Sequence, residues 1–346
     1  MKKDENIRVG ISIGDLNGIG PEIILKTFED PRTLELCTPV IFASSRVVNF
    51  FKKHFKSKIN AYEVNNTKDI VSGKLNVVNV WKENVTIEFG KEDPKIGEFA
   101  IRSLEASVKA LKNNFVDILV TAPINKHNIQ SEQFNFPGHT NYLAEQLNGD
   151  SLMFMVTDNL KVGLLTDHVP VKDVPNHITE ELIRQKIDTV SKSLKQDFAV
   201  SRPKIAVLAI NPHAGDNGVI GNEDDILLKP TLKAIKDKGT LVYGPYSADS
   251  FFGSHNYKNF DAVIASYHDQ GLIPFKTITF GEGVNYTAGL SKVRTSPDHG
   301  TAYEIAGKGE ANESSFKKAV YTGIEIFRRR EEYQTYSKNP LKKATK

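Results

Sequence analysis

Short apolar runs alternate with amphipathic segments along most of the chain. The runs are rich in β-branched residues and are flanked by turn-forming residues, a pattern typical of buried strands. We therefore expect strands at 8–13, 39–43, 117–121, 204–210 and 261–265.

The segments between these runs carry apolar residues at helical spacing. Over 101–111 and again over 183–194, the apolar residues recur at steps of three and four, which places them on one helix face. A last long helix is expected over about 315–333. Alternation of strands and helices predicts an α/β fold whose sheet is mostly parallel and covered on both sides.

One pair of apolar runs has a different pattern. The runs at 153–156 and 162–166 are joined by a short polar stretch that contains Thr157-Asp158-Asn159. Such spacing favours a β-hairpin. A hairpin at this position could form part of a subunit contact.

Composition excludes several classes of protein. The chain has 346 residues, of which 39% are hydrophobic, enough for two domains or one large α/β unit. It contains no apolar run of about 18 residues, so no membrane span is expected. The polar start of the chain lacks the apolar core of a secretory signal, and Cys37 is the only cysteine. A reducing, cytoplasmic location is therefore expected.

The net charge gives little reason to expect a nucleic-acid partner. Without the four lysines of the basic tail at 338–346, the formal charge falls from +3 to −1. A protein with that balance lacks the basic face that binds a phosphate backbone.

In open α/β sheets, ligands bind where the strands end, so the residues directly after each apolar run are the first candidates for a site. The first run leads into a loop at 14–22 with three glycines and Pro21, which is suited to the first turn of a helix. Such a loop could present backbone N–H groups to an anion, or it could be a structural turn. It matches neither the dinucleotide-binding fingerprint nor a P-loop.

Three later runs each end in a histidine that has Asp, Asn or Gly close by. These are His168, His213 and His268. Three imidazoles from three strand ends would make an open metal site that leaves positions for substrate or water. Such ligands favour zinc, cobalt or another transition metal over magnesium, which stays possible if oxygen ligands complete the site.

Other polar residues predict an anionic substrate. His139 and Thr140 come after Pro137-Gly138 at the start of an expected helix over 141–147. Downstream of the last histidine come two cations and an amide, Lys276, Asn285 and Arg294. An arginine can bind a phosphate or a carboxylate through two parallel hydrogen bonds.

Together these segments resemble the 4-hydroxythreonine-4-phosphate dehydrogenase family of vitamin B6 biosynthesis. One departure is Leu16-Asn17, where the family often has Pro-Ala. The matching segments run in order over nearly the whole chain: Gly14-Asp15, Gly18-Ile-Gly-Pro-Glu22, Thr121-Ala-Pro-Ile-Asn-Lys126, Phe136-Pro-Gly-His-Thr140, Asp167-His168, Asn211-Pro-His-Ala-Gly215, Tyr267-His-Asp-Gln-Gly271, Gly283-Val-Asn285 and Arg294-Thr-Ser-Pro-Asp-His-Gly300.

The resemblance implies a fold like that of the isocitrate and isopropylmalate dehydrogenases, with two α/β subdomains and a cleft between them. We expect one catalytic unit over 1–346, with approximate subdomains 1–135 plus 280–346 and 136–279. The family is homodimeric, with an active site at the subunit interface and metal ligands from both subunits.

The resemblance also assigns roles to single residues. His168, His213 and His268 match the metal ligands, one divalent ion per subunit, whether zinc, cobalt or magnesium. The positions that match the family's substrate-binding residues are His139, Thr140, Lys276, Asn285 and Arg294.

The reaction that the resemblance implies is oxidation of 4-phosphooxy-L-threonine by NAD or NADP. The product, 2-amino-3-oxo-4-phosphooxybutanoate, would lose CO2 to give 3-amino-2-oxopropyl phosphate. Asp249 and Lys276 are the two candidates for the general base. Three alternatives stay open: a sister dehydrogenase for threonate or erythronate 4-phosphate, a phosphate acyltransferase on a related fold, and a metal-binding protein without catalysis.

Overall fold

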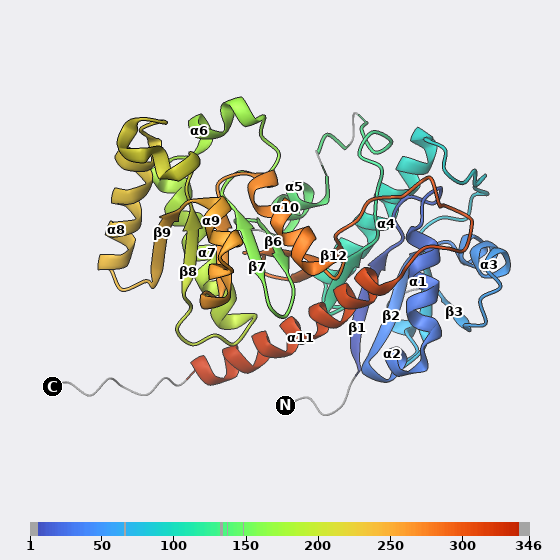
Figure 1. Cartoon of the computed structure of the whole chain (residues 1–346). Coiled ribbons are helices and arrows are strands. Elements are labelled where there is room, and N and C mark those ends of the chain that lie inside the picture. Colours follow the sequence, from blue (N-terminus) through green and yellow to red (C-terminus); the bar gives the residue numbers. More distant parts are fainter. Residues whose placement is uncertain (1–5, 66, 132–133, 137, 148, 339–346) are drawn as a thin grey trace. The chain divides into compact units, whose positions relative to one another are not determined.

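The structure is a computed structural model that describes residues 6–338 except 66, 132–133, 137 and 148, so nearly all of the expected basic tail lies outside it. The chain divides into two compact units (Figure 1). Unit 1 comprises 1–151 and 284–324, and unit 2 comprises 152–283 and 325–346. No helix among the described residues is long and apolar enough to cross a membrane.

Unit 1 contains most of the N-terminal half of the chain. Its helices are α1 (Gly20–Glu29), α2 (Pro31–Leu36), α3 (Ser45–His54), α4 (Pro94–Lys112), α5 (His139–Leu147) and the first part of α11 (Ser314–Ser337). Its strands are β1 (Ile7–Ser12), β2 (Cys37–Ala43), β3 (Ala61–Val64), β4 (Leu75–Asn79), β5 (Ile118–Thr121), β11 (Val284–Ala288) and β12 (Val293–Pro297).

The strands of unit 1 are arranged in the order β3-β4-β2-β1-β5-β12-β11. All pairings are parallel except that of β11 with β12, so the predicted parallel sheet is confirmed here. Side chains alternate between the faces of a strand. Val40 and Phe42 accordingly pack with α4 and α5 residues, whereas Ile41 faces α1 and α3. Helices thus cover both faces.

The core beneath α4 also draws in the segment after β5. Tyr142, Leu143 and Leu147 of α5 are buried in the same apolar cluster as Leu104 and Val108 of α4. The described residues of 136–151 therefore belong to unit 1.

Some of the helices begin at a residue whose side chain caps them. Asp93 accepts a hydrogen bond from the backbone N–H of Lys95 at the start of α4, and Pro94 occupies the first turn. In unit 2, Thr179 caps α7 (Glu180–Gln196) in the same way, and two acidic residues stand in its first turn. The predicted helices over 101–111 and 183–194 are confirmed as parts of α4 and α7.

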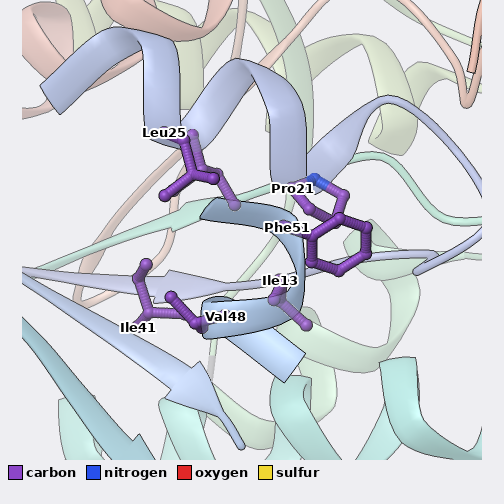
Figure 2. A pocket seen from close by; sticks show the side chains of 7 residues that line it. Ile13, Pro21, Leu25, Ile41, Val48 and Phe51 are labelled. Carbon is purple, nitrogen blue, oxygen red and sulfur yellow. The ribbon is translucent and has the colours of Figure 1, made fainter. Parts of the chain in front are cut away.

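A very small cavity lies under α1 in the core of unit 1 (Figure 2). Its volume is about 10 Å³, which is about the least space that one water molecule needs. Only apolar side chains line it: Ile13, Pro21, Ile24, Leu25, Ile41, Val48 and Phe51. This void is a packing defect and not a ligand site.

Replacement of Leu25 by alanine is expected to destabilise the protein, because it would enlarge this void inside a packed core. The free energy of unfolding should fall by about 2–5 kcal/mol, measured by urea denaturation. Leu36→Ala is the matched control: Leu36 is 42% exposed, and its loss should change the unfolding free energy by less than about 0.5 kcal/mol. Equal effects of the two substitutions would contradict this packing around Leu25.

The strands of unit 2 are arranged in the order β6-β7-β10-β8-β9. The hairpin of β6 and β7 is antiparallel, as predicted, and the other pairings are parallel. Its helices are α6 (Val174–His177), α7, α8 (Lys229–Asp237), α9 (Ala248–Gly253), α10 (His268–Thr279) and the end of α11. Its strands are β6 (Leu152–Val156), β7 (Lys161–Leu164), β8 (Ile205–Leu208), β9 (Val242–Tyr246) and β10 (Ala262–Ala265).

Candidate functional site

The three histidines predicted as metal ligands come directly after three neighbouring strands of unit 2. His168 comes after β7, His268 begins α10 after β10, and His213 comes after β8. Strand β10 pairs with β7 on one side and with β8 on the other, both in parallel. Because parallel strands end at one edge of a sheet, all three imidazoles belong to the same edge of unit 2.

Two of these histidines lie close together within one chain, with their ring planes tilted by 46°. The ring centroids of His168 and His268 are 5.8 Å apart. Nδ1 of His268 is 2.7 Å from a carboxylate oxygen of Asp269, and Nδ1 of His168 is 3.8 Å from one of Asp167. A carboxylate at Nδ1 directs Nε2 outward, which is the usual arrangement around a protein-bound metal. The pKa of Asp167 lies well below its ordinary value, chiefly because of the interaction with His168.

His213 is held by an unusual backbone. The residues 213–217 all have positive φ, with His213 at φ 53° and ψ 26°, and together they form a left-handed turn. Such a conformation costs free energy for every residue other than glycine. The buried Asp224 carboxylate accepts hydrogen bonds from the backbone N–H groups of Ile210 and Asn211, each at 2.9 Å, and so fixes the start of this turn.

The two candidates for the general base lie on different elements of unit 2. Asp249 stands in the first turn of α9, where Ser247 Oγ donates a hydrogen bond to it at 2.7 Å. That hydrogen bond, with a smaller electrostatic effect of His213, lowers the pKa of Asp249. Lys276 lies exposed in the last turn of α10.

One copy of the chain does not by itself assemble a full ligand set in the part that the structure describes. There, no group of three or more His, Cys, Asp or Glu side chains is arranged to hold a metal ion. His168 and His268 are brought together, and His213 lies within electrostatic reach of Asp249.

Unit 1 holds a buried cation. Arg294 on β12 is 2% exposed, and its guanidinium donates hydrogen bonds to the hydroxyls of Thr121 and Thr287. Among the described residues, no carboxylate pairs with it. Burial lowers the pKa of Arg294 to about 9, so the group stays protonated at neutral pH. A buried positive charge without an acid is available to an anionic ligand.

His139, at the start of α5, lies within electrostatic reach of this cation. Burial, together with the charges of Arg294 and Lys126, holds the pKa of His139 well below its ordinary value, so the ring is neutral. Its Nε2 is buried and has no hydrogen-bond partner among the described residues. Oδ1 of Asn285 on β11 is likewise buried and has no partner there. Buried polar atoms without partners are rare in folded proteins and indicate a place for a ligand. Thr140, the next residue of α5, is half-buried.

The neutral state of His139 predicts a pH effect on stability. The unfolded chain would protonate this ring below about pH 6.5, whereas the folded chain resists protonation, so the free energy of unfolding should fall as the pH drops through that region. His139→Asn should remove this contribution and flatten the pH dependence between about pH 7.5 and about pH 5.5. Urea unfolding at both pH values measures how the free energy of unfolding changes with pH. An equal change in wild type and variant would contradict the neutral state of His139.

The glycine-rich loop after β1 proves to be structural. The backbone N–H groups of Asp15, Asn17, Gly18 and Ile19 all donate to acceptors inside the chain, so the alternative of an anion-binding loop is wrong for them. Gly14 has φ +72°, and a Cβ there would lie 2.3 Å from the carbonyl oxygen of Pro123. Close backbone packing, not a ligand, accounts for this glycine.

The sequence did not reveal how this loop is tied to its neighbours. Asp15 is fully buried. Its carboxylate accepts one hydrogen bond from the Tyr303 hydroxyl at 2.7 Å and another from Asn128 Nδ2 at 3.2 Å. Burial raises the pKa of Asp15. These contacts join the loops that come after β1, β5 and β12. Asn17, at the departure from the family pattern, binds Glu88 N and Lys91 O through its side chain.

Thr121 and Thr287 were also not identified as site residues from the sequence. Thr121 belongs to one of the matching segments, and that was the only available signal. Thr287 lies in β11, whose five residues alternate between apolar and polar; that pattern indicates a strand but does not mark a site residue.

Comparison with known proteins gives a consistent result. The model of the family described as pyridoxal phosphate biosynthetic protein PdxA matches residues 35–323. A 4-hydroxythreonine-4-phosphate dehydrogenase from Bacteroides thetaiotaomicron is 48% identical over 99% of this chain and 94% of its own length. A D-threonate 4-phosphate dehydrogenase from Cupriavidus necator is 35% identical over 93% of this chain and 98% of its own.

The fold agrees as well. A crystal structure of a 4-hydroxythreonine-4-phosphate dehydrogenase from Klebsiella pneumoniae superposes with a TM-score of 0.79 and 29% identity, covering 94% of this chain and 98% of that one. The predicted α/β fold is thereby confirmed. On the family model and on relatives that match over nearly their full length, this chain belongs to the PdxA family.

Proposed function

We propose that this chain is a dehydrogenase that oxidises 4-phosphooxy-L-threonine with NAD or NADP. Several of its relatives are named 4-hydroxythreonine-4-phosphate dehydrogenases. The observation that carries the proposal is the buried Arg294. Among the described residues this cation has no acid partner, and Nε2 of His139, within its electrostatic reach, has no hydrogen-bond partner. That pair suits a phosphorylated or carboxylated substrate.

The residues of unit 1 would bind and orient the substrate. Arg294 would donate hydrogen bonds to an anionic oxygen, and His139, being neutral, could donate one more from Nε2 without adding charge. Oδ1 of Asn285, which has no partner in the part of the chain that the structure describes, would accept a hydrogen bond from the substrate. We include Thr140 and Lys276 among the substrate-binding residues on the family resemblance.

His168, His213 and His268 would hold one divalent metal. The carboxylates at Nδ1 of His168 and His268 fit such a role, and three imidazoles favour zinc or cobalt over magnesium. The ion would supply Lewis-acid polarisation of a substrate hydroxyl. NAD or NADP would accept the hydride from C3.

A protein group must take the proton of the C3 hydroxyl. Asp249 is a carboxylate at neutral pH and lies within electrostatic reach of His213, whereas Lys276 lies in the last turn of the helix that His268 begins. We keep both as candidates. Loss of CO2 from the resulting β-keto acid would then yield 3-amino-2-oxopropyl phosphate.

We further propose that the enzyme works as a homodimer in which both copies contribute metal ligands. The incomplete ligand set within the described part of one chain favours this arrangement.

The test of the function is direct. Purified protein is mixed with NAD or NADP and with 4-phosphooxy-L-threonine, and nicotinamide reduction is followed with and without a chelator. The second candidate, threonate 4-phosphate oxidation, is favoured by the 35% identical relative of that name. A higher kcat/KM for threonate 4-phosphate would decide for it, and no reduction with either substrate would refute both.

A further inference from the structure

The environment of Arg294 is unusual because both of the side chains that accept its hydrogen bonds are neutral. Thr121 Oγ1 accepts hydrogen bonds from Nε at 3.2 Å and from Nη2 at 2.5 Å. Thr287 Oγ1 accepts one from Nη1 at 3.0 Å. Both threonines are fully buried. A guanidinium has five N–H donors, so two have no acceptor among the described residues and are available to a ligand.

The sheet itself builds this arrangement. Arg294 lies on β12, which is flanked by β5 on one side and β11 on the other. It pairs in register with Leu119, and Thr121 lies two residues further along β5 on the same face. On the other side, Tyr286 pairs with Thr295, so Thr287 stands one step along the ladder, opposite Arg294. Rigid strands therefore set the position of both hydroxyls.

The choice of threonine matters for charge. A buried arginine is ordinarily paired with a carboxylate, which satisfies the donors but also neutralises the cation. A threonine hydroxyl satisfies the same donors and carries no charge. We infer that Thr121 and Thr287 are positioning residues that orient the Arg294 guanidinium while keeping its charge available for an oxyanion of the substrate.

This inference rests on the proposed function, since it requires Arg294 to bind the substrate. It adds a reason why the affinity should depend on two residues that need not touch the substrate. Hydrogen bonds to charged groups are strong, so loss of one acceptor should let the guanidinium turn away from its bound orientation.

The experiment compares variants of the whole enzyme with two readouts: KM and kcat for the phosphorylated substrate, and competitive inhibition by inorganic phosphate. Thr121→Val and Thr287→Val should each raise KM and the phosphate inhibition constant by about 10-fold, with kcat changed by less than about 3-fold. Thr121→Ser keeps the hydroxyl and should restore both constants to within about 2-fold of wild type.

The decisive variant is Thr287→Asp, which replaces the neutral acceptor by a charged one. It should fold and melt at a temperature no lower than wild type, because it gives the buried cation an acid. It should nevertheless weaken phosphate binding by about 100-fold or more. If the valine variants fail to fold, this variant alone decides the question.

Thr295→Val is the matched control. Thr295 is the next residue of β12, is equally buried, and donates its hydroxyl to Ala319 O on the opposite face of the sheet. Its loss should lower the melting temperature without changing KM. Normal phosphate binding by Thr287→Asp, or a KM for Thr121→Val equal to that of wild type, would overturn the inference. A normal KM for Arg294→Met would instead overturn the proposed role of Arg294 itself.

Discussion

Replacement of His268 by alanine is expected to remove the bound metal and to lower kcat/KM by more than about 100-fold. Even the loss of a residue that only orients a metal ligand typically costs about 10- to 100-fold, and His268 is proposed as a ligand itself. Metal content by mass spectrometry and nicotinamide reduction are the two measurements. His168→Ala and His213→Ala should behave alike, because three ligands would share one ion.

His177→Ala is a suitable control for this series. His177 is an exposed histidine of the same unit, at the end of α6, and bonds Asp173 O through Nδ1. It should keep both metal and activity. Full metal content in all three ligand variants would refute the metal site.

The same variants also test the proposed dimer. Mixing inactive His213→Ala with inactive His268→Ala subunits should restore part of the activity if ligands from different copies meet in one site. Absence of any recovery after verified subunit exchange would show that each copy supplies its own ligands.

The second large effect is expected for Arg294→Met. The substitution removes the charge and the two donors left for the substrate, so KM for the phosphorylated substrate should rise by about 100-fold or more. The melting temperature should stay the same or rise, because a buried cation without an acid is costly to fold.

Arg294→Lys separates charge from geometry. A lysine keeps the positive charge but lacks the planar fork, so its KM should lie between those of wild type and Arg294→Met. A methionine variant with low stability and normal KM would instead mean that Arg294 serves the fold alone.

The strand-end histidines could be predicted because each comes after a buried apolar run, a local property of the sequence. The sequence could not show that β7, β10 and β8 are neighbours, since the order of strands depends on contacts between distant segments. It therefore predicted three candidate ligands but not that the rings of His168 and His268 would lie close together.

The surroundings of Arg294 were harder to foresee. Strands β11 and β12 carry Asn285, Arg294 and two threonines. The short strand β11 alternates apolar and polar residues, but β12 shows neither an apolar run nor such an alternation. The partners of Arg294 are determined only by strand pairing. For the loop at 14–20, by contrast, the sequence suggested a possible ligand site where there is none. Tight packing explains Gly14, and backbone N–H groups of the loop already donate hydrogen bonds within the chain.

The backbone of the turn at 213–217 is left-handed, the mirror image of an ordinary right-handed helix. For a D-amino acid the same backbone angles would be the relaxed ones. Chemical replacement of Ala214 by D-alanine should therefore cost the protein nothing locally, whereas a β-branched L-residue would be excluded there. Few residue types are therefore compatible with this turn. They are glycine, asparagine and aspartate and, at a cost in free energy, alanine and histidine.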